Sequence, residues 1–545
     1  MTRVPTTTND ARAPRTGRAA VLVAAGILAS RLVGLVRQRV ISHYFGLTTD
    51  AADAWAAGFR IPNVLQNLFG EGALSASFIP VYAGLLSQGR RREADRVAGA
   101  VGALLALVVS GTVLVGVLAT PWGIDVIAPG FTGAKRDLTI TVVRILFPGA
   151  GVLVLSAWCL GVLNSHHRFL LSYASPVVWS VAMIAALLWY GGGTELPRLV
   201  AILAWASVAG SALQLAVQLP VVLRLAPDLR WSLDTTSPDI RTVVRNFVPT
   251  FFSRGVVQIS AYVDTILASW LPAGATAGLM NAQLLYTLPV SLFGMSISAA
   301  ELPAMSGAAL ADGGAYEALR RRLDAGLRRI AFFVIPSAVL FLALGDVVAA
   351  ALLQTGRFRQ EDAVHVWTIL AGSAVGLLAS TLGRLYASTY FALRDTKTPL
   401  RFAVVRVALT TTLGYVCAIH LPRWLGIDPS WGTAGLTASA GVAGWVEMLL
   451  LRRTLNRRIG VTGLPVGLVA RLWSAAALGA AVAWAIRSRL PSLPPIAAAI
   501  AILGPYALVF FGATLLFGIH ESRQAVRRFL SRGVRLSAKG SRRDY

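Results

Sequence analysis

Apolar stretches of about 20 residues recur along almost the whole chain, and this repetition leaves few folds open. A helix needs about 20 apolar residues to cross the hydrocarbon core of a bilayer. Of the 545 residues, 55% are hydrophobic and 14% are charged, whereas about a quarter of the residues in a soluble domain are charged. A β-barrel would instead show short segments of alternating polarity. The sequence therefore predicts an all-α polytopic membrane protein.

The apolar stretches can be divided into about fourteen transmembrane spans. Several prolines fall inside spans, among them Pro62, Pro148 and Pro336, and they predict kinks. The spans run over residues 19–42, 51–84, 94–120, 138–163, 169–190, 197–223, 243–271, 274–307, 327–352, 363–392, 399–421, 431–451, 466–487 and 495–518.

The net charge of +25 would suggest nucleic-acid binding in a soluble chain. Here most arginines and lysines fall in alternate short loops between spans, so the positive-inside rule explains them better. The pattern predicts that both termini lie in the cytoplasm and that nucleic acid is not a partner. The main basic clusters are Arg90–Arg92, Arg320–Arg322 with Arg328 and Arg329, Arg452–Arg458, and Arg523–Arg543.

The spans group into two blocks of six with two left over. Transporters are often built from such paired halves. The expected organisation is a cytoplasmic tail (1–18), an N-terminal lobe (19–225), a C-terminal lobe (238–458), two further spans (466–518) and a basic cytoplasmic tail (519–545).

Polar residues inside the spans are the candidate functional residues, because ionisable groups at membrane depth usually face a polar interior or a substrate path. Helical spacing places them in stripes that predict a water-accessible cavity between the lobes. The stripes comprise Arg31, Arg37 and Gln38 in the first span, Arg60, Asn63, Gln66, Asn67 and Glu71 in the second, and Gln283, Thr287 and Glu301 in the eighth; Arg254 and Asp264 lie in the seventh and Asp53 at the start of the second.

Each of these residues also has a purely structural interpretation. Arg37 and Arg60 could lie near helix ends and extend to the lipid headgroups. Glu71 and Glu301 could only neutralise a nearby arginine. Asp264 lies in the middle of a span and could pair with an arginine or bind a cation.

Motifs for enzymatic chemistry are absent from the sequence. There is no G-x-x-x-x-G-K-[ST] loop for ATP hydrolysis, no H-E-x-x-H and no paired C-x-x-C. The two cysteines, Cys159 and Cys417, lie within spans and are interpreted as packing residues. We therefore expect neither an enzyme nor a bound metal or cofactor, with the membrane potential or a monovalent cation gradient as the candidate energy source.

Several motifs resemble those of the MurJ (MviN) lipid II flippase family, which is part of the multidrug/oligosaccharidyl-lipid/polysaccharide exporter superfamily. They occur in order from the first span to the eleventh. The matching segments are SRLVGLVRQ (30–38), the D-A-x-x-A of 53–57, RIPNVLQNLFGEGALSASFIPVY (60–82), APGF (128–131), LNSHHRF (163–169), LQLAVQLP (213–220), LLQTGRF (352–358) and YFALRDTKTPLR (390–401).

The resemblance implies two six-helix lobes around a central cavity, with the last two spans shaping a groove for a lipid tail. It also implies transfer of the undecaprenyl-pyrophosphate-linked peptidoglycan precursor, lipid II, to the outer leaflet of the bacterial inner membrane. In that family, cavity arginines engage the anionic headgroup. Arg31 and Arg37 match two such positions, and Asp53 and Glu71 match acidic positions.

The chain departs from the family pattern at several cavity positions. Gln38 replaces an aspartate, Gln66 and Asn67 stand where an arginine is expected, and Gln283 with Leu284 replaces an Asp-Arg pair. A neutral donor makes a hydrogen bond to phosphate that is about half as strong as one from a cation. Arg254 is a candidate replacement cation.

These features lead to one main functional hypothesis and several alternatives. The main hypothesis is a lipid II flippase that works by alternating access, with membrane lipids and cell-wall synthesis proteins as further partners. The alternatives are a flippase for another polyprenyl-linked glycan, a small-molecule exporter, a membrane-embedded glycosyltransferase, and a non-transporting scaffold for wall synthesis.

Overall fold

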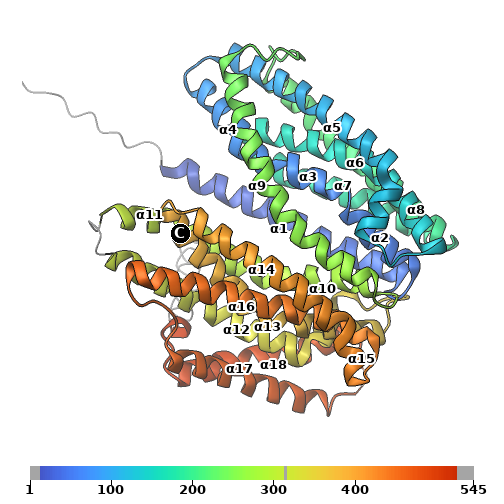
Figure 1. Ribbon diagram of the computed structural model, residues 1–545, viewed down its shortest axis with the longest axis vertical. Coiled ribbons are helices and arrows are strands. Elements are labelled where there is room, and N and C mark those ends of the chain that lie inside the picture. Colours follow the sequence, from blue (N-terminus) through green and yellow to red (C-terminus); the bar gives the residue numbers. More distant parts are fainter. Residues whose placement is uncertain (1–12, 312–315, 492, 524–545) are drawn as a thin grey trace, which may run out of the picture. The chain divides into compact units, whose positions relative to one another are not determined.

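Long helices make up most of the chain in a computed structural model that describes residues 13–311, 316–491 and 493–523 (Figure 1). Within the helices, the side chains of residues 13–25, 27, 252–254, 256–261 and 309–311 lie outside the described part. Twelve helical segments of the described residues are long and apolar enough to cross a membrane. The two other predicted spans coincide with α1 (Ala13–Phe45) and α9 (Pro238–Ser269), of 33 and 32 residues. The predicted all-helical polytopic fold is confirmed.

The chain divides into two compact units, residues 1–266 and 267–545. Unit 1 contains α1 and most of α9, and α6 lies in its core, where it packs on α2, α4, α5 and α8. The other helices of unit 1 are α2 (Asp50–Arg60), α3 (Asn63–Phe69), α4 (Glu71–Ser87), α5 (Arg91–Ile127), α6 (Gly133–Ser165), α7 (Phe169–Tyr190) and α8 (Leu196–Leu225).

The position of α9 differs from the division that the sequence suggested, which assigned this helix to the C-terminal lobe. In the structure, Phe247 and Phe251 of α9 lie with their ring centroids 5.9 and 5.1 Å from that of Phe69 in α3. Farther along α9, the Thr265 hydroxyl accepts a hydrogen bond of 2.9 Å from Arg60. Aromatic packing and this bond attach α9 to the helices of unit 1.

The segment between α8 and α9, residues 226–237, lies along α5, and we call it the linker strap. The Asp95 carboxylate accepts a hydrogen bond from the Asp228 backbone N–H (3.2 Å). At Gly99 the strap is so close that a Cβ atom would lie 2.1 Å from the carbonyl oxygen of Arg230. The strap can therefore lie on α5 only because residue 99 has no side chain.

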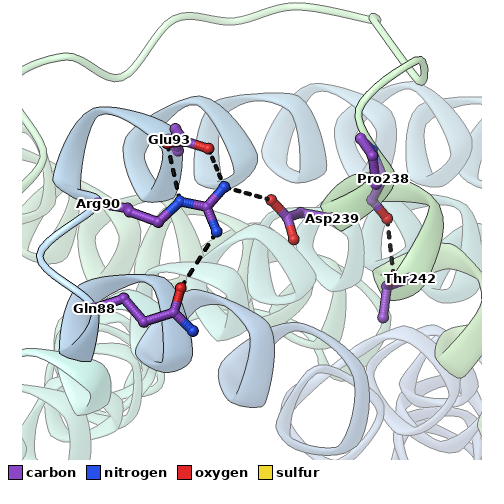
Figure 2. Close-up of polar contacts among 6 residues, drawn as sticks. All are labelled: Gln88, Arg90, Glu93, Pro238, Asp239 and Thr242. Carbon is purple, nitrogen blue, oxygen red and sulfur yellow. Dashed lines mark hydrogen bonds and ion pairs between the residues drawn. The ribbon is translucent and has the colours of Figure 1, made fainter.

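A polar cluster extends this attachment to the first turn of α9 (Figure 2). Arg90, which precedes α5, forms a bidentate ion pair with Glu93 and donates a hydrogen bond of 3.3 Å to the Gln88 side chain. Its Nη2 atom also lies 3.8 Å from a carboxylate oxygen of Asp239 in α9. The start of α9 is thus attached to the α4–α5 turn through one guanidinium group.

Unit 2 is built around α13, which makes its most extensive contacts with α16 and α12. Small residues allow the close approach to α16: a Cβ atom at Gly376 would lie 2.4 Å from the Cα of Gly441. Such contacts are common between membrane helices, where small residues let backbones pack closely. The helices of unit 2 are α10 (Ala275–Pro289), α11 (Ser296–Ala311), α12 (Glu317–Leu353), α13 (Gln360–Ala392), α14 (Lys397–Tyr415), α15 (Leu421–Leu425), α16 (Gly432–Ile459), α17 (Val466–Arg487) and α18 (Pro495–Leu516), and short π- and 3₁₀-helical turns cover Val290–Met295, Val416–His420 and Pro429–Trp431.

The last two spans, α17 and α18, lie side by side and pack on α12 (Figure 1). The Tyr506 hydroxyl of α18 donates a hydrogen bond of 2.6 Å to the Pro336 carbonyl of α12. Arg487, at the end of α17, binds both carboxylate oxygens of Asp346 (3.1 and 2.6 Å), and the Asp346 side chain is only 5% exposed. The buried Asp346 carboxylate therefore relies on Arg487 to neutralise its charge.

We expect Arg487→Ala to destabilise unit 2, because it leaves the Asp346 carboxylate without its cation. The loss should be roughly 1.5–3 kcal/mol, the value of a hydrogen bond to a charged group. The measurement is equilibrium denaturation in detergent. Arg489→Ala, which changes an exposed arginine nearby, is the control. Equal stability of the two variants would show that the pair contributes nothing.

The loop between α13 and α14 is held by Asp395. Its carboxylate accepts hydrogen bonds from the backbone N–H (3.0 Å) and hydroxyl (2.7 Å) of Thr398 and from Arg458 (2.6 Å). Burial acts to raise the pKa of Asp395, but these bonds outweigh it and lower the pKa from 3.8 to about 2. The folded state therefore favours the ionised carboxylate.

Because the pKa of Asp395 is lower in the folded protein, its contribution to stability is complete above the unfolded value and is lost as the pH falls from about 4 to about 2. We expect Arg458→Ala to raise the pKa of Asp395 in the folded protein and so to reduce the loss of stability at low pH. Thermal unfolding measured between pH 5 and pH 2.5 tests this, with the exposed Arg457→Ala as the matched control. If Arg458→Ala lost as much thermal stability between pH 5 and pH 2.5 as the wild-type protein, this loss could not be attributed to the Asp395–Arg458 pair.

Candidate functional site

The second predicted span is broken into three helices, and the breaks position its polar residues. Pro62 lies between α2 and α3, and Gly70 lies between α3 and α4. The Gly70 N–H donates to the Gln66 carbonyl (2.9 Å), and a Cβ atom at Gly70 would lie 2.1 Å from that same oxygen. A glycine is therefore needed at this point for the chain to leave α3 and start α4.

Helix α3 forms one wall of a cavity that lies entirely within unit 1. The cavity is small, with a volume of about 30 Å³. Leu146, Gly149, Ala150 and Leu153 of α6 also line it. The polar and aromatic residues around it are Phe59, Asn63, Gln66, Trp179 and Ser207.

Trp179 in α7 connects this cavity to the first span. Its indole N–H donates to the carbonyl (3.0 Å) and hydroxyl (3.1 Å) oxygens of Ser207, and its ring stacks on Phe59 at a centroid distance of 5.9 Å. The guanidinium of Arg37 lies 4.5 Å from the Trp179 ring and donates a hydrogen bond of 3.2 Å to Ser180. The structure thus places Arg37 over an aromatic residue of the cavity wall, and Arg37 is not itself among the lining residues.

A buried chain of neutral hydrogen bonds links α6, α7 and α8. Gln214 donates to Ser156 (2.7 Å), Ser156 donates to Gln218 (2.6 Å), and Gln218 donates to Ser175 (2.5 Å). All four side chains are buried. The Gln214 side-chain oxygen has no hydrogen-bond partner in the described part of the chain.

Other predicted site residues of unit 1 have partners away from this cavity. Asp53 is buried in an ion pair with Lys135 (2.5 Å), whose ammonium group also lies 4.3 Å from the Phe131 ring. Arg60 binds Thr265 of α9, as described above. These contacts join α2 to α6 and to α9.

The remaining predicted residues of unit 1 differ in burial. Gln38 is buried, Asn67 is half-buried, and Glu71 and Arg31 are exposed. Within the described part of the chain, the Arg31 side chain makes no hydrogen bond or ion pair.

On α9, Asp264 is half-buried beside Thr265. The side chain of Arg254, the candidate replacement cation, lies outside the described residues.

The polar stripe of the eighth span lies in unit 2, in α10 and α11. The Gln283 side-chain amide donates to the Thr287 hydroxyl (3.3 Å), and that hydroxyl donates to the Gln283 carbonyl (2.7 Å). Glu301 pairs with Arg329 (3.0 Å) and lies 3.7 Å from Arg322. Glu301 thus lies beside two cations of α12.

Sequence reasoning missed Phe59, Trp179 and Ser207 as site residues. Aromatic and serine residues are common in membrane helices, so no local signal distinguished them. Gln214 and Gln218 did carry a signal: they lie four residues apart in an apolar span and so share one helix face.

Comparison with known proteins places this architecture in a family. The profile of the lipid II flippase MurJ family matches residues 41–504. The chain belongs to the MurJ family. It is 32% identical over 448 residues to the lipid II flippase MurJ of Burkholderia cenocepacia, covering 81% of this chain and 84% of that protein. It is 30% identical over 539 residues to the probable lipid II flippase MurJ of Rhizobium meliloti, covering 95% and 96%. The resemblance seen in the sequence motifs is confirmed.

Solved structures agree with the MurJ family fold. A lipid II flippase MurJ in an inward closed conformation matches with a TM-score of 0.74 at 21% identity, over 91% of this chain and 98% of that one. An inward-facing multidrug resistance MATE family transporter matches with a TM-score of 0.63 at 17% identity, over 81% and 98%. The fold is therefore shared with transporters. The protein is a multi-pass membrane protein of a transporter family and not an enzyme.

Proposed function

We propose that this protein moves lipid II, the undecaprenyl-pyrophosphate-linked peptidoglycan precursor, from the cytoplasmic to the outer leaflet of the bacterial inner membrane. The observation that carries the proposal is the MurJ family match over residues 41–504, which spans the helices of both units. The two relatives described above are named as a flippase and a probable flippase of lipid II.

The proposed mechanism is alternating access by two lobes. Both termini lie in the cytoplasm in this proposal, which is supported by the basic clusters of alternate loops. The headgroup enters a cavity between the lobes from the cytoplasmic side, and α17 with α18 guides the polyprenyl tail in the lipid.

In this proposal, arginine side chains bind the pyrophosphate. Arg31 is the best placed, because its side chain is exposed and makes no ion pair within the described residues. Arg37, Arg60 and Arg254 supply further positive charge, and Gln66, Asn67 and Glu71 contribute polar contacts to the headgroup.

The proposed energy source is the membrane potential or a monovalent cation gradient. Moving one charge through the full potential is worth about 2.3 kcal/mol per 100 mV. Asp264 and Glu301 are the proposed coupling residues, and Glu301 pairs with Arg329 of α12.

The test is a leaflet-accessibility assay of labelled lipid II in vesicles that contain only this protein. We expect labelled lipid II to exchange between leaflets, and we expect Arg31→Ala to reduce the rate strongly while Arg489→Ala does not. No exchange above that of protein-free vesicles would overturn the proposal. Faster exchange of another polyprenyl-linked glycan than of lipid II would favour the alternative cargo.

A further inference from the structure

Two arginines of unit 2 lie beside the end of α18 that carries Phe517. Arg471, in the first two turns of α17, donates hydrogen bonds to the carbonyl oxygens of Gly467 (3.0 Å) and Phe517 (3.1 Å). The Arg523 side chain lies near the same turn, because a Cβ atom at Gly518 would lie 3.7 Å from its Nη2 atom. Two guanidinium groups therefore meet at the last residues of α18.

A third arginine, Arg328 of α12, is brought to this end by the packing of two helices. The Tyr506 hydroxyl of α18 bonds to the Pro336 carbonyl of α12. One turn farther along α18, the Phe510 ring centroid lies 5.7 Å from that of Phe332, which is one turn earlier in α12. The two helices thus run in opposite directions, and one more turn brings Arg328 level with the last turn of α18. Arg328 also shares a helix face with Phe332, four residues away.

These three arginines, which we call the basic cluster, form no ion pair with any described residue. All three side chains are exposed, and the hydrogen bonds of Arg471 go only to backbone carbonyl groups. Elsewhere in unit 2, Arg458 and Arg487 each bind a carboxylate. Ionised groups on membrane helices usually pair with one another or mark the site of a ligand. The basic cluster therefore favours an anionic ligand.

The surface next to the basic cluster is apolar. Leu508, Phe511 and Leu515 of α18 are exposed and follow steps of three and four residues, so they share one face that leads to the level of Arg328. The Phe511 ring centroid lies 6.0 Å from that of Phe332, on the α12 face that also carries Arg328. A ligand that suits both surfaces has a negatively charged head and an apolar body.

We propose that the basic cluster binds the phosphate of one anionic phospholipid, such as phosphatidylglycerol, whose acyl chains lie on the exposed face of α18. Basic sites between membrane helices bind such headgroups. The lipid would connect α12, α17 and α18, which pack on one another (Figure 1). In the orientation proposed above, it belongs to the cytoplasmic leaflet.

This lipid is a resident of the protein and not its cargo. The membrane supplies anionic phospholipid in large excess over any transported precursor. The arginines proposed above for the pyrophosphate all belong to unit 1, whereas the basic cluster belongs to unit 2. The inference therefore does not rest on transport of lipid II.

The experiment measures lipid affinity by native mass spectrometry of the full-length protein. We expect one phosphatidylglycerol to bind more tightly than phosphatidylcholine with the same acyl chains. Arg328→Gln combined with Arg523→Gln should keep the fold, because neither side chain bonds to a described residue. Each arginine near a lipid headgroup is worth about fivefold in affinity, so the double variant should bind phosphatidylglycerol roughly 25-fold more weakly.

The matched control removes two other exposed arginines of unit 2, by Arg453→Gln combined with Arg457→Gln on α16. Thermal unfolding in detergent gives a second measurement, since a ligand of the folded state raises the unfolding temperature. Added phosphatidylglycerol should raise it for the wild-type protein and the control but not for the Arg328/Arg523 variant. Equal affinity of that variant and the control for phosphatidylglycerol, or equal affinity of the wild-type protein for both phospholipids, overturns the proposal.

Competition distinguishes the resident lipid from the cargo. Undecaprenyl pyrophosphate, which carries the phosphates and tail of lipid II, is added at the same concentration as phosphatidylglycerol. We expect the wild-type protein to keep its phosphatidylglycerol. Displacement of phosphatidylglycerol at this ratio would assign the basic cluster to the cargo and overturn the proposal.

Discussion

Gly99→Ala should destabilise the protein, although alanine is the better helix former. Replacing glycine by alanine inside a helix normally stabilises by up to about 1 kcal/mol. At Gly99 the new methyl group would lie 2.1 Å from the carbonyl oxygen of Arg230, so the linker strap must move away from α5. Forced overpacking of this kind costs roughly 1–3 kcal/mol. The net effect of Gly99→Ala on stability is therefore destabilising, although helix propensity alone would make it stabilising.

The matched control for this prediction lies on the same helix. Gly111→Ala changes an exposed glycine of α5 where a Cβ meets no atom within 4 Å, so it should be neutral or slightly stabilising. Equilibrium denaturation in detergent measures both variants, and limited proteolysis within residues 226–237 reports detachment of the strap. If Gly99→Ala were as stable as Gly111→Ala and its linker as resistant to protease, the strap would not be held as described.

Gly70→Ala should abolish transport while the protein still inserts into the membrane. A methyl group at this position would overlap the Gln66 carbonyl oxygen, so α3 must shift or unwind at its end. That movement displaces the Gln66 and Asn63 carboxamides from the cavity wall. Displacements of about 1 Å at a binding site can cost a hundredfold in rate.

Transport by Gly70→Ala is measured as rescue of a flippase-depleted strain and as lipid II exchange in vesicles. Gly84→Ala, in the next helix, should behave like the wild-type protein, because its Cβ has open space. Normal rescue by a Gly70→Ala protein present at wild-type level would show that the break before α4 does not need a glycine.

Much of the fold could be predicted from the sequence because apolar length alone defines a membrane span. The spans expected at 169–190 and 466–487 coincide with α7 and α17. Pro62 also signalled the first break of the second span. The second break, at Gly70, was not anticipated, because glycine is common within membrane helices and only the approach of the Gln66 carbonyl makes it necessary here.

The site was harder to predict because its contacts join distant parts of the chain. Helical spacing places both Gln66 and Asn67 within a turn of Asn63 in α3, and it could not decide that Gln66 lines the cavity with Asn63 while Asn67 does not. The lysine that pairs with Asp53 lies 82 residues away, in α6. Periodicity identifies which residues are polar within a span, whereas their partners depend on how helices pack.

The hydrogen-bond chain of Gln214, Ser156, Gln218 and Ser175 carries no formal charge, although it lies deep among three spans. A transmembrane voltage exerts force only on charges and oriented dipoles that move within it. The hydrogen bonds that link α6, α7 and α8 should therefore be equally stable with and without a membrane potential. Any voltage sensitivity of the transport cycle should then vary with substitutions at ionised residues and be indifferent to substitutions among these four.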